Sequence, residues 1–121
     1  MAGPARAGVV VYAQDLDQLA RFYEGVAGMR RLHADRERIV LASDDAHLVV
    51  HAAFAPMSDP GAPRADAAFK PFFTVNDLDH ALTDVAALGG IGLPGRWSGP
   101  GFEVCNACDP EGNIIQLRAF A

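Results

Sequence analysis

An excess of basic residues, long apolar runs and frequent cysteines are all missing from this chain of 121 residues, whose only dense cationic stretches are Arg30-Arg31 and residues 36–38. Lys and Arg number 10 against 15 Asp and Glu, which gives a formal net charge of −5. Binding to a phosphate backbone needs clustered cations, so nucleic acid is not an expected partner. No apolar stretch approaches the roughly 20 residues of a membrane span, and no membrane partner is expected. The first residues show no basic segment followed by an apolar one, so we expect a cytoplasmic protein.

Only two cysteines are present, Cys105 and Cys108, and they form a Cys-x-x-Cys spacing. This spacing also occurs in redox and zinc sites. Here it falls in residues 102–108, whose pattern indicates a β-strand, and residues three apart in a strand point to opposite faces. No second Cys-x-x-Cys completes a zinc site. We therefore interpret the pair as two buried thiols.

One segment of the chain occurs twice. Residues 9–17 read VVVYAQDLD and residues 71–79 read PFFTVNDLD, which places the aligned Asp15 and Asp77 62 positions apart (77 − 15). Each copy is a short apolar run, an Asp and then apolar residues at helical spacing. Asp15 is a predicted helix N-cap. The repeat therefore predicts two modules that each begin with a strand and a helix.

Strand patterns follow both helices. They cover residues 29–34, 38–43 and 47–51 in the first half, and 91–93, 102–108 and 114–120 in the second. A turn at 109–113 contains Pro and Gly and joins the last two segments. The pattern predicts one α+β domain over residues 1–121, with modules at 8–51 and 70–121. An Ala- and Pro-rich linker, 52–69, joins the modules.

The motifs resemble a known superfamily. These motifs are the repeated Asp-Leu-Asp, Arg21-Phe22-Tyr23, Gly28 and the closing DPEGNIIQL at residues 109–117. They resemble the vicinal oxygen chelate superfamily, which includes glyoxalase I, extradiol dioxygenases, fosfomycin resistance enzymes and bleomycin resistance proteins. The resemblance covers nearly the whole chain and is closest to the metal-free, bleomycin-resistance-like branch. It implies two βαβββ modules that form an incomplete barrel, a homodimer, and a small organic molecule bound in the concave cavity.

The resemblance also says where metal-using members carry their ligands, on the first and last strands of the modules. Those places fall here on Gly8, Val49, Lys70 and Gln116. Gly and Val offer no side-chain donor, Lys is cationic, and only the amide oxygen of Gln116 can ligate. A zinc or iron centre normally takes three protein ligands. We therefore expect no metal and no cofactor, and leave open one irregular site of a histidine with Gln116 and Glu103.

Alternation along the strands predicts which side chains line the cavity. By this parity the predicted ligand-binding residues are Tyr12, His47, His51, Lys70, Phe72, Gln116 and Arg118. Trp97 joins them because residues 96–103 resemble the loop of bleomycin resistance proteins whose aromatic ring lies over the ligand, and Glu103, in the same stretch, is predicted at the pocket rim. His47 and His51 share a face but lie ~13 Å apart, too far to hold one metal. Two interpretations stay open for several of these residues. Lys70 binds an anion or extends to solvent, Trp97 covers the ligand or fills the module interface, and Glu103 lies at the pocket rim or is an ordinary edge-strand carboxylate.

Two functional hypotheses follow from these residues. The first is a metal-independent small-molecule-binding protein that sequesters an antibiotic or an aromatic or anionic metabolite. The second is an enzyme of the same superfamily, a lyase, isomerase or dioxygenase with an unusual metal site or metal-free chemistry. The absence of the expected metal ligands favours the first, and no catalytic residue is assigned.

Overall fold

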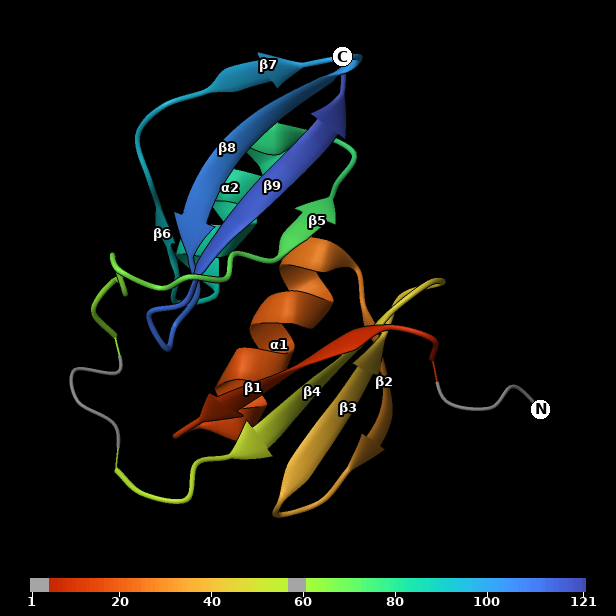
Figure 1. Ribbon diagram of the computed structural model, residues 1–121, viewed down its shortest axis with the longest axis vertical. Coiled ribbons are helices and arrows are strands. Elements are labelled where there is room, and N and C mark those ends of the chain that lie inside the picture. Colours follow the sequence, from red (N-terminus) through yellow and green to blue (C-terminus); the bar gives the residue numbers. More distant parts are fainter. Residues whose placement is uncertain (1–4, 57–60) are drawn as a thin grey trace.

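The computed structural model describes residues 5–56 and 61–121 (Figure 1). The four residues 57–60 of the predicted linker lie outside the described residues, as do residues 1–4. The first half of the chain forms β1 (Gly8–Ala13), α1 (Leu16–Ala27), β2 (Arg30–Ala34), β3 (Arg38–Ala42) and β4 (His47–Ala52). The second half forms β5 (Phe72–Thr74), α2 (Leu78–Ala87), β6 (Ile91–Gly92), β7 (Trp97–Gly99), β8 (Phe102–Cys108) and β9 (Ile114–Phe120). The predicted α+β fold is confirmed, with one short strand, β7, that the sequence pattern did not indicate.

Each half forms its own sheet, and the two sheets have related topologies. The strand order is β1-β4-β3-β2 in the first and β5-β9-β8-β6 in the second, where β7 pairs with a separate stretch of β8. The first strand of each module runs parallel to the last, so β1 lies beside β4 and β5 beside β9. Neither sheet closes on itself within the described residues. The first and last strands of each module are thus neighbours in its sheet.

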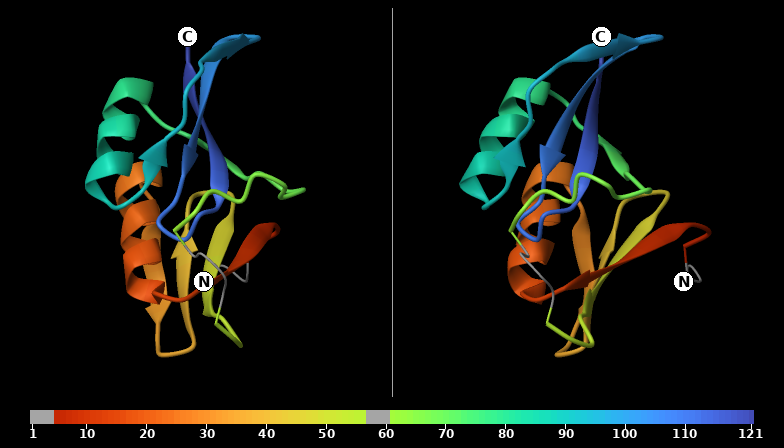
Figure 2. Two further views of the ribbon diagram at one scale, coloured as in Figure 1. Left: turned by 90° about the vertical axis from the view of Figure 1, so that its left-hand side faces the viewer. Right: turned by 60° about the vertical axis from the view of Figure 1, so that its left-hand side comes forward.

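Both helices lie on one side of the molecule, and the two sheets lie on the other (Figure 2). The helices begin where the sequence dictates, since the Asp15 and Asp77 side chains accept the backbone N–H groups of Gln18 and His80. Fully buried apolar residues from α1, α2 and both sheets then form one continuous core: Leu19, Phe22, Leu41, Val50, Val85, Ile115 and Leu117. Each helix therefore covers one face of its sheet and leaves the other face open. In the described ranges, no helix is long and apolar enough to cross a membrane.

Two buried carboxylates in the turn between β8 and β9 join the modules. Glu111 accepts the backbone N–H groups of Gln14 and Asp15, at 2.9 and 3.0 Å, directly before α1. Asp109 accepts the hydroxyl of Tyr23 in α1 at 2.6 Å. Both carboxylates are almost fully buried, at 3% and 1% exposure. Buried charges are tolerated only with such partners, so the closing motif of the second module fixes the position of α1 in the first.

The same network supplies a test of what holds the modules together. Burial, followed by the charge of Asp109, raises the pKa of Tyr23 well above its ordinary value. Tyr23→Phe removes one donor to a buried carboxylate, which should cost about 1–3 kcal/mol of unfolding free energy at neutral pH. A phenol with a raised folded-state pKa stabilises fully below the unfolded-state pKa, about 10, and this stabilisation is lost as the pH rises further.

Urea unfolding of wild type and Tyr23→Phe, at neutral pH and above pH ~10, measures this contribution. The difference in unfolding free energy between wild type and Tyr23→Phe should become smaller at the higher pH. A difference that stays constant across this range, or that is absent at neutral pH, would show that the Tyr23–Asp109 hydrogen bond does not stabilise the fold.

Candidate ligand-binding site

The open faces of the two sheets carry most of the predicted ligand-binding residues, but in separate groups. Lys70, Trp97, Gln116 and Arg118 lie together on the second sheet. Tyr12 and His51 lie on the first sheet, and His47 borders a cleft between the modules. Successive side chains of a strand point to opposite faces of the sheet. In β9, Ile115 and Leu117 therefore turn into the core while Gln116 and Arg118 lie on the open face.

A pocket of about 340 Å³ lies on the open face of the second sheet. Its lining comes from the segment before β5 and from β7, β8 and β9: Lys70, Trp97, Ser98, Gly99, Phe102, Val104, Asn106, Gln116 and Arg118. Trp97 is half exposed at the mouth. Pockets for organic molecules typically combine apolar walls with a few converging polar groups, and this one has that composition.

Arg118 has the most ordered surroundings in this pocket. Its Nε donates a hydrogen bond to Gln116 Oε1 at 2.7 Å. Its Cζ lies 3.9 Å from the centroid of the Phe72 ring and 4.8 Å from that of Phe102. Phe72 comes from β5 and Phe102 from β8, the strands on either side of β9. Cation–π contacts from both neighbours therefore hold the guanidinium against the sheet.

Positive charge in the pocket has no acidic partner among the residues described. None of the seven salt bridges in this part of the chain includes Lys70 or Arg118. The Lys70 ammonium makes one long contact, 3.5 Å to Asn106 Oδ1. Lys70 itself is exposed and Arg118 partly buried. Two cations that point at an apolar surface without a counter-ion form an arrangement suited to an anionic ligand.

Five lining residues were not predicted from the sequence: Ser98, Gly99, Phe102, Val104 and Asn106. A β-carbon at Gly99 would lie 2.3 Å from the Phe102 ring, so glycine at this position lets the ring lie across β7. Phe102 and Asn106 have the strand parity of Val104, which pairs with Arg118. Alternation along β8 was the signal that could have placed both residues on the open face.

Glu103 does not lie with the other predicted residues. It pairs with Ser98 and Ala119 and has the parity of Cys105 and Ala107, which belong to the core. Its side chain is therefore on the helix-covered side of β8, and its prediction as a pocket residue is corrected. The irregular metal site of a histidine, Gln116 and Glu103 does not form, because these residues lie on different faces. In residues 5–56 and 61–121, no three His, Cys, Asp or Glu side chains are grouped to hold a metal.

The first sheet carries an aromatic cluster of its own on the open face. The ring centroids of Tyr12 and His51 are 5.5 Å apart, and Phe54 lies 5.7 and 5.5 Å from them. His51 Nδ1 is 2.9 Å from the Ala52 carbonyl oxygen, so in the neutral ring Nδ1 carries the proton and Nε2 accepts. Within one chain this cluster is separate from the pocket around Arg118.

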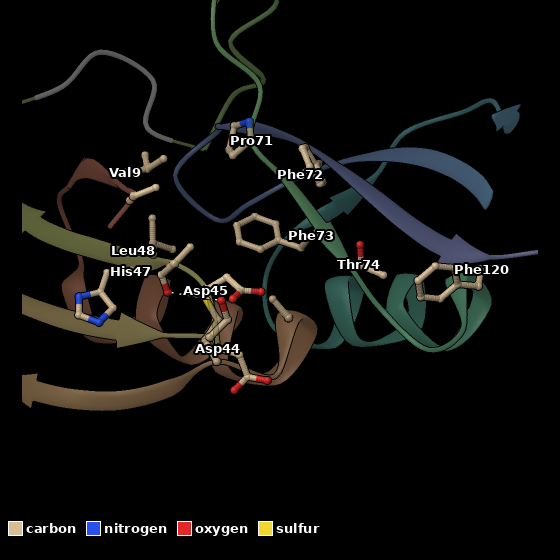
Figure 3. Close-up of a pocket in the computed structure, with 16 residues that line it drawn as sticks. Val9, Asp44, Asp45, His47, Leu48, Pro71, Phe72, Phe73, Thr74 and Phe120 are labelled. Carbon is tan, nitrogen blue, oxygen red and sulfur yellow. Dashed lines mark hydrogen bonds between the residues drawn. The ribbon is translucent and has the colours of Figure 1, made fainter. Parts of the chain in front are cut away.

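A larger cleft, of about 810 Å³, lies between the two modules (Figure 3). On one side are Val9, Leu48 and His47 with the acidic turn of Asp44 and Asp45, and on the other are residues 71–74 and Phe120. Strand β1 pairs only with β4 and β5 only with β9 in the described chain, so both have an unpaired edge. The cleft thus borders two unpaired strand edges and exposed apolar side chains.

The four places that correspond to metal ligands in the superfamily do not fit a metal ion. A β-carbon at Gly8 would lie 2.6 Å from the His47 carbonyl oxygen, because β1 and β4 approach closely there. Val49 has no donor, and Lys70 brings a positive charge. The Gln116 amide oxygen already accepts the Arg118 Nε–H. The first position is closed by backbone and the last is engaged by a cation.

Comparisons with known proteins agree with this fold. No curated protein matches the chain. Among solved structures, a glyoxalase/bleomycin resistance protein/dioxygenase family enzyme from Burkholderia phytofirmans matches with a TM-score of 0.77 and 15% identity, over 97% of this chain and 99% of that chain. The fosfomycin resistance protein FosX from Mesorhizobium loti matches with a TM-score of 0.68 and 18% identity, over 100% and 95%. At these identities the likeness shows the fold alone.

A family model described as "Glyoxalase-like domain" matches residues 8–118, nearly the whole chain. The residues that it covers include both sheets, both helices and the pocket around Arg118. The chain therefore belongs to the glyoxalase-like domain family of the vicinal oxygen chelate superfamily.

Proposed function

We propose that this protein binds a planar, partly anionic organic molecule on the open face of the second sheet, without help from a metal ion. The observation that carries the proposal is the pocket in which Lys70 and Arg118 lie beside Trp97, Phe72 and Phe102 and have no acidic partner in the described residues. Aromatic acids and acidic natural-product antibiotics have the required combination of a flat ring and negative charge. Binding of such a molecule would sequester it.

The residues at the places that the resemblance assigns to metal ligands support metal-independent binding. Gly8 cannot carry a side chain without moving β1, and Gln116 serves as an acceptor for Arg118. The enzymatic alternative receives no support from Lys70. A lysine that acts as a base or forms a Schiff base is usually desolvated, whereas this one is exposed. A cytoplasmic location, expected from the sequence, stays a prediction.

Restoring a metal ligand at position 8 tests the metal-independence proposal. Gly8→His places a β-carbon against the His47 carbonyl, so we expect a loss of about 1–3 kcal/mol in unfolding free energy. We expect no tight Zn²⁺ binding, because Lys70 and the engaged Gln116 remain. Urea unfolding and competition for Zn²⁺ with a chromophoric chelator measure the two effects. Arg36→His, in an exposed turn, is the control for an added histidine. Stoichiometric zinc in Gly8→His at unchanged stability would show that position 8 is open to a metal ligand and would remove this support for the proposal.

Ligand binding at the second sheet is testable by a screen of aromatic acids with thermal shift, because a ligand that binds the native state raises its melting temperature. Hits should be weakened by Lys70→Met and by Trp97→Leu, which remove a cation and a flat ring from the pocket. The matched controls Arg36→Gln and Leu32→Ala alter an exposed cation and an exposed apolar residue away from it. Hits that respond to the controls as much as to the pocket variants would show that binding occurs elsewhere.

We also propose that a second copy of the chain covers the cleft between the modules. The support is the pair of unpaired strand edges, together with exposed apolar side chains at Val9, Phe72 and Phe120, which are 47%, 54% and 83% exposed. Exposed apolar surface beside free strand edges is a typical place for association. A stable interface of this kind buries on the order of 1,600 Å².

The proposed dimer predicts a specific effect of charge in the cleft. Sedimentation should show a dimer at micromolar concentration, and Val9→Asp should shift it to monomer by burying an unpaired carboxylate at the interface. Leu32→Asp introduces the same charge on β2, away from the cleft, and should leave the dimer intact. A monomeric wild type, or equal dissociation of both variants, would contradict this assembly.

A further inference from the structure

We propose that Arg118 receives a carboxylate of the ligand with its two terminal nitrogens, and that Gln116 is a positioning residue that holds the guanidinium for this contact. The inference rests on the proposed function and narrows its ligand to planar aromatic carboxylates. It assigns roles to two neighbours in β9 whose side chains meet on the open face.

Contacts around the guanidinium leave one part of it for a ligand. The Phe72 and Phe102 rings take up space near Cζ, at 3.9 and 4.8 Å. The Nε–H is occupied by Gln116. Of the five N–H donors of an arginine, the four on the terminal nitrogens have no protein acceptor among the described residues. This edge has the spacing of a carboxylate, which an arginine binds with two parallel hydrogen bonds.

Gln116 lies at the place where the superfamily resemblance puts a last-strand metal ligand. Its amide oxygen accepts from Arg118, so it limits the rotation of the arginine side chain without cancelling its charge. A glutamate at this position would neutralise the guanidinium and compete with the ligand. The neutral amide of Gln116 therefore suits anion binding by Arg118 better than a carboxylate at this position, which would suit a divalent metal ion.

The rest of the pocket favours a carboxylate over a phosphate. A phosphate is usually met by several donors, such as the backbone N–H groups of a helix N-terminus or a glycine-rich loop. The described lining includes no residue of α1 or α2, and Lys70 is exposed and further out. The walls are aromatic, with Trp97 and Phe102 offering flat surfaces beside the charge. A single planar anionic group attached to a ring matches these walls and the one fork of donors.

A nuclear magnetic resonance titration of the ¹⁵N-labelled full chain tests this inference with three probes. These are 2-naphthoate, its neutral analogue 2-naphthamide, and inorganic phosphate. The Trp97 indole N–H reports that the pocket is occupied, since it is the only tryptophan in the chain. The Arg118 Nε–H, identified by its loss in Arg118→Lys, reports on the guanidinium. We expect 2-naphthoate to shift both signals and to bind about tenfold or more tightly than either other probe.

Variants distinguish the role of Arg118, which binds the carboxylate, from that of Gln116, which positions the guanidinium. Arg118→Lys keeps the charge but loses the fork, and should weaken 2-naphthoate about tenfold while changing 2-naphthamide less than about twofold. Gln116→Met removes the acceptor and should weaken 2-naphthoate and abolish the sharp Arg118 Nε–H signal. Gln116→Glu should weaken 2-naphthoate as well, by neutralising the guanidinium. Arg36→Gln is the control for loss of an exposed cation, and circular dichroism verifies that each variant is folded.

The outcomes distinguish this inference from the function on which it rests. Equal affinity for 2-naphthoate and 2-naphthamide, with a shifted Trp97 signal, would overturn the carboxylate assignment and support binding at the pocket. Tighter binding of phosphate would also overturn it. No shift of Trp97 with any probe would contradict both proposals. An unchanged affinity and an unchanged Arg118 signal in Gln116→Met would overturn the positioning role of Gln116.

Discussion

The hydrogen bonds of Asp109 and Glu111 to the first module determine how the two halves of this protein are arranged. Each carboxylate is buried and accepts hydrogen bonds from donors that lie 86 to 97 positions away, at Tyr23, Gln14 and Asp15. Breaking the Glu111 hydrogen bonds would leave that buried carboxylate without the two donors it has in the described residues, whereas Asp109 would keep those of Glu111 N–H and Asn113. Because α1 is thereby held on the same side as α2, the open faces of the sheets remain on the other (Figure 2). The pocket around Arg118 and the unpaired edges of β1 and β5 follow from that arrangement.

This protein has the fold of the superfamily, but its polar groups differ from those that the resemblance assigns to a metal site. Close approach of β1 to β4 at Gly8 removes the space for a ligand side chain. Lys70 and Arg118 bring positive charge instead, and Gln116 is an acceptor within the protein. Under the proposed function, Lys70 and Arg118 balance the negative charge on the ligand. Two of the four places that the resemblance assigns to metal ligands, Lys70 and Gln116, thus line the pocket of the proposed anion.

Sequence periodicity predicted the α+β fold, because the repeated Asp-Leu-Asp segments mark equivalent strand-to-helix junctions in both modules. Strand parity also grouped Gln116 with Arg118, since alternation is a local property of the backbone. Strand parity did not predict that Tyr12 and His51 lie on a different sheet from Arg118 within the chain. The relative placement of the two modules depends on long-range contacts such as that of Glu111 with the backbone before α1. Glu103 was misplaced because it was assigned by its nearness to Trp97 in sequence and not by its parity on β8. Strand β7 was missed because Pro94 and Pro100 around it indicate a loop.

The central claim is that the ligand is held by the protein's own cations and not by a metal ion. The most direct measurement is the affinity of the purified protein for 2-naphthoate before and after exhaustive chelation, with transition metals quantified by elemental analysis in both samples. We expect well below one metal ion per chain in the untreated protein and the same affinity after chelation. Stoichiometric metal whose removal abolishes 2-naphthoate binding, with binding restored when that metal is returned, would contradict it.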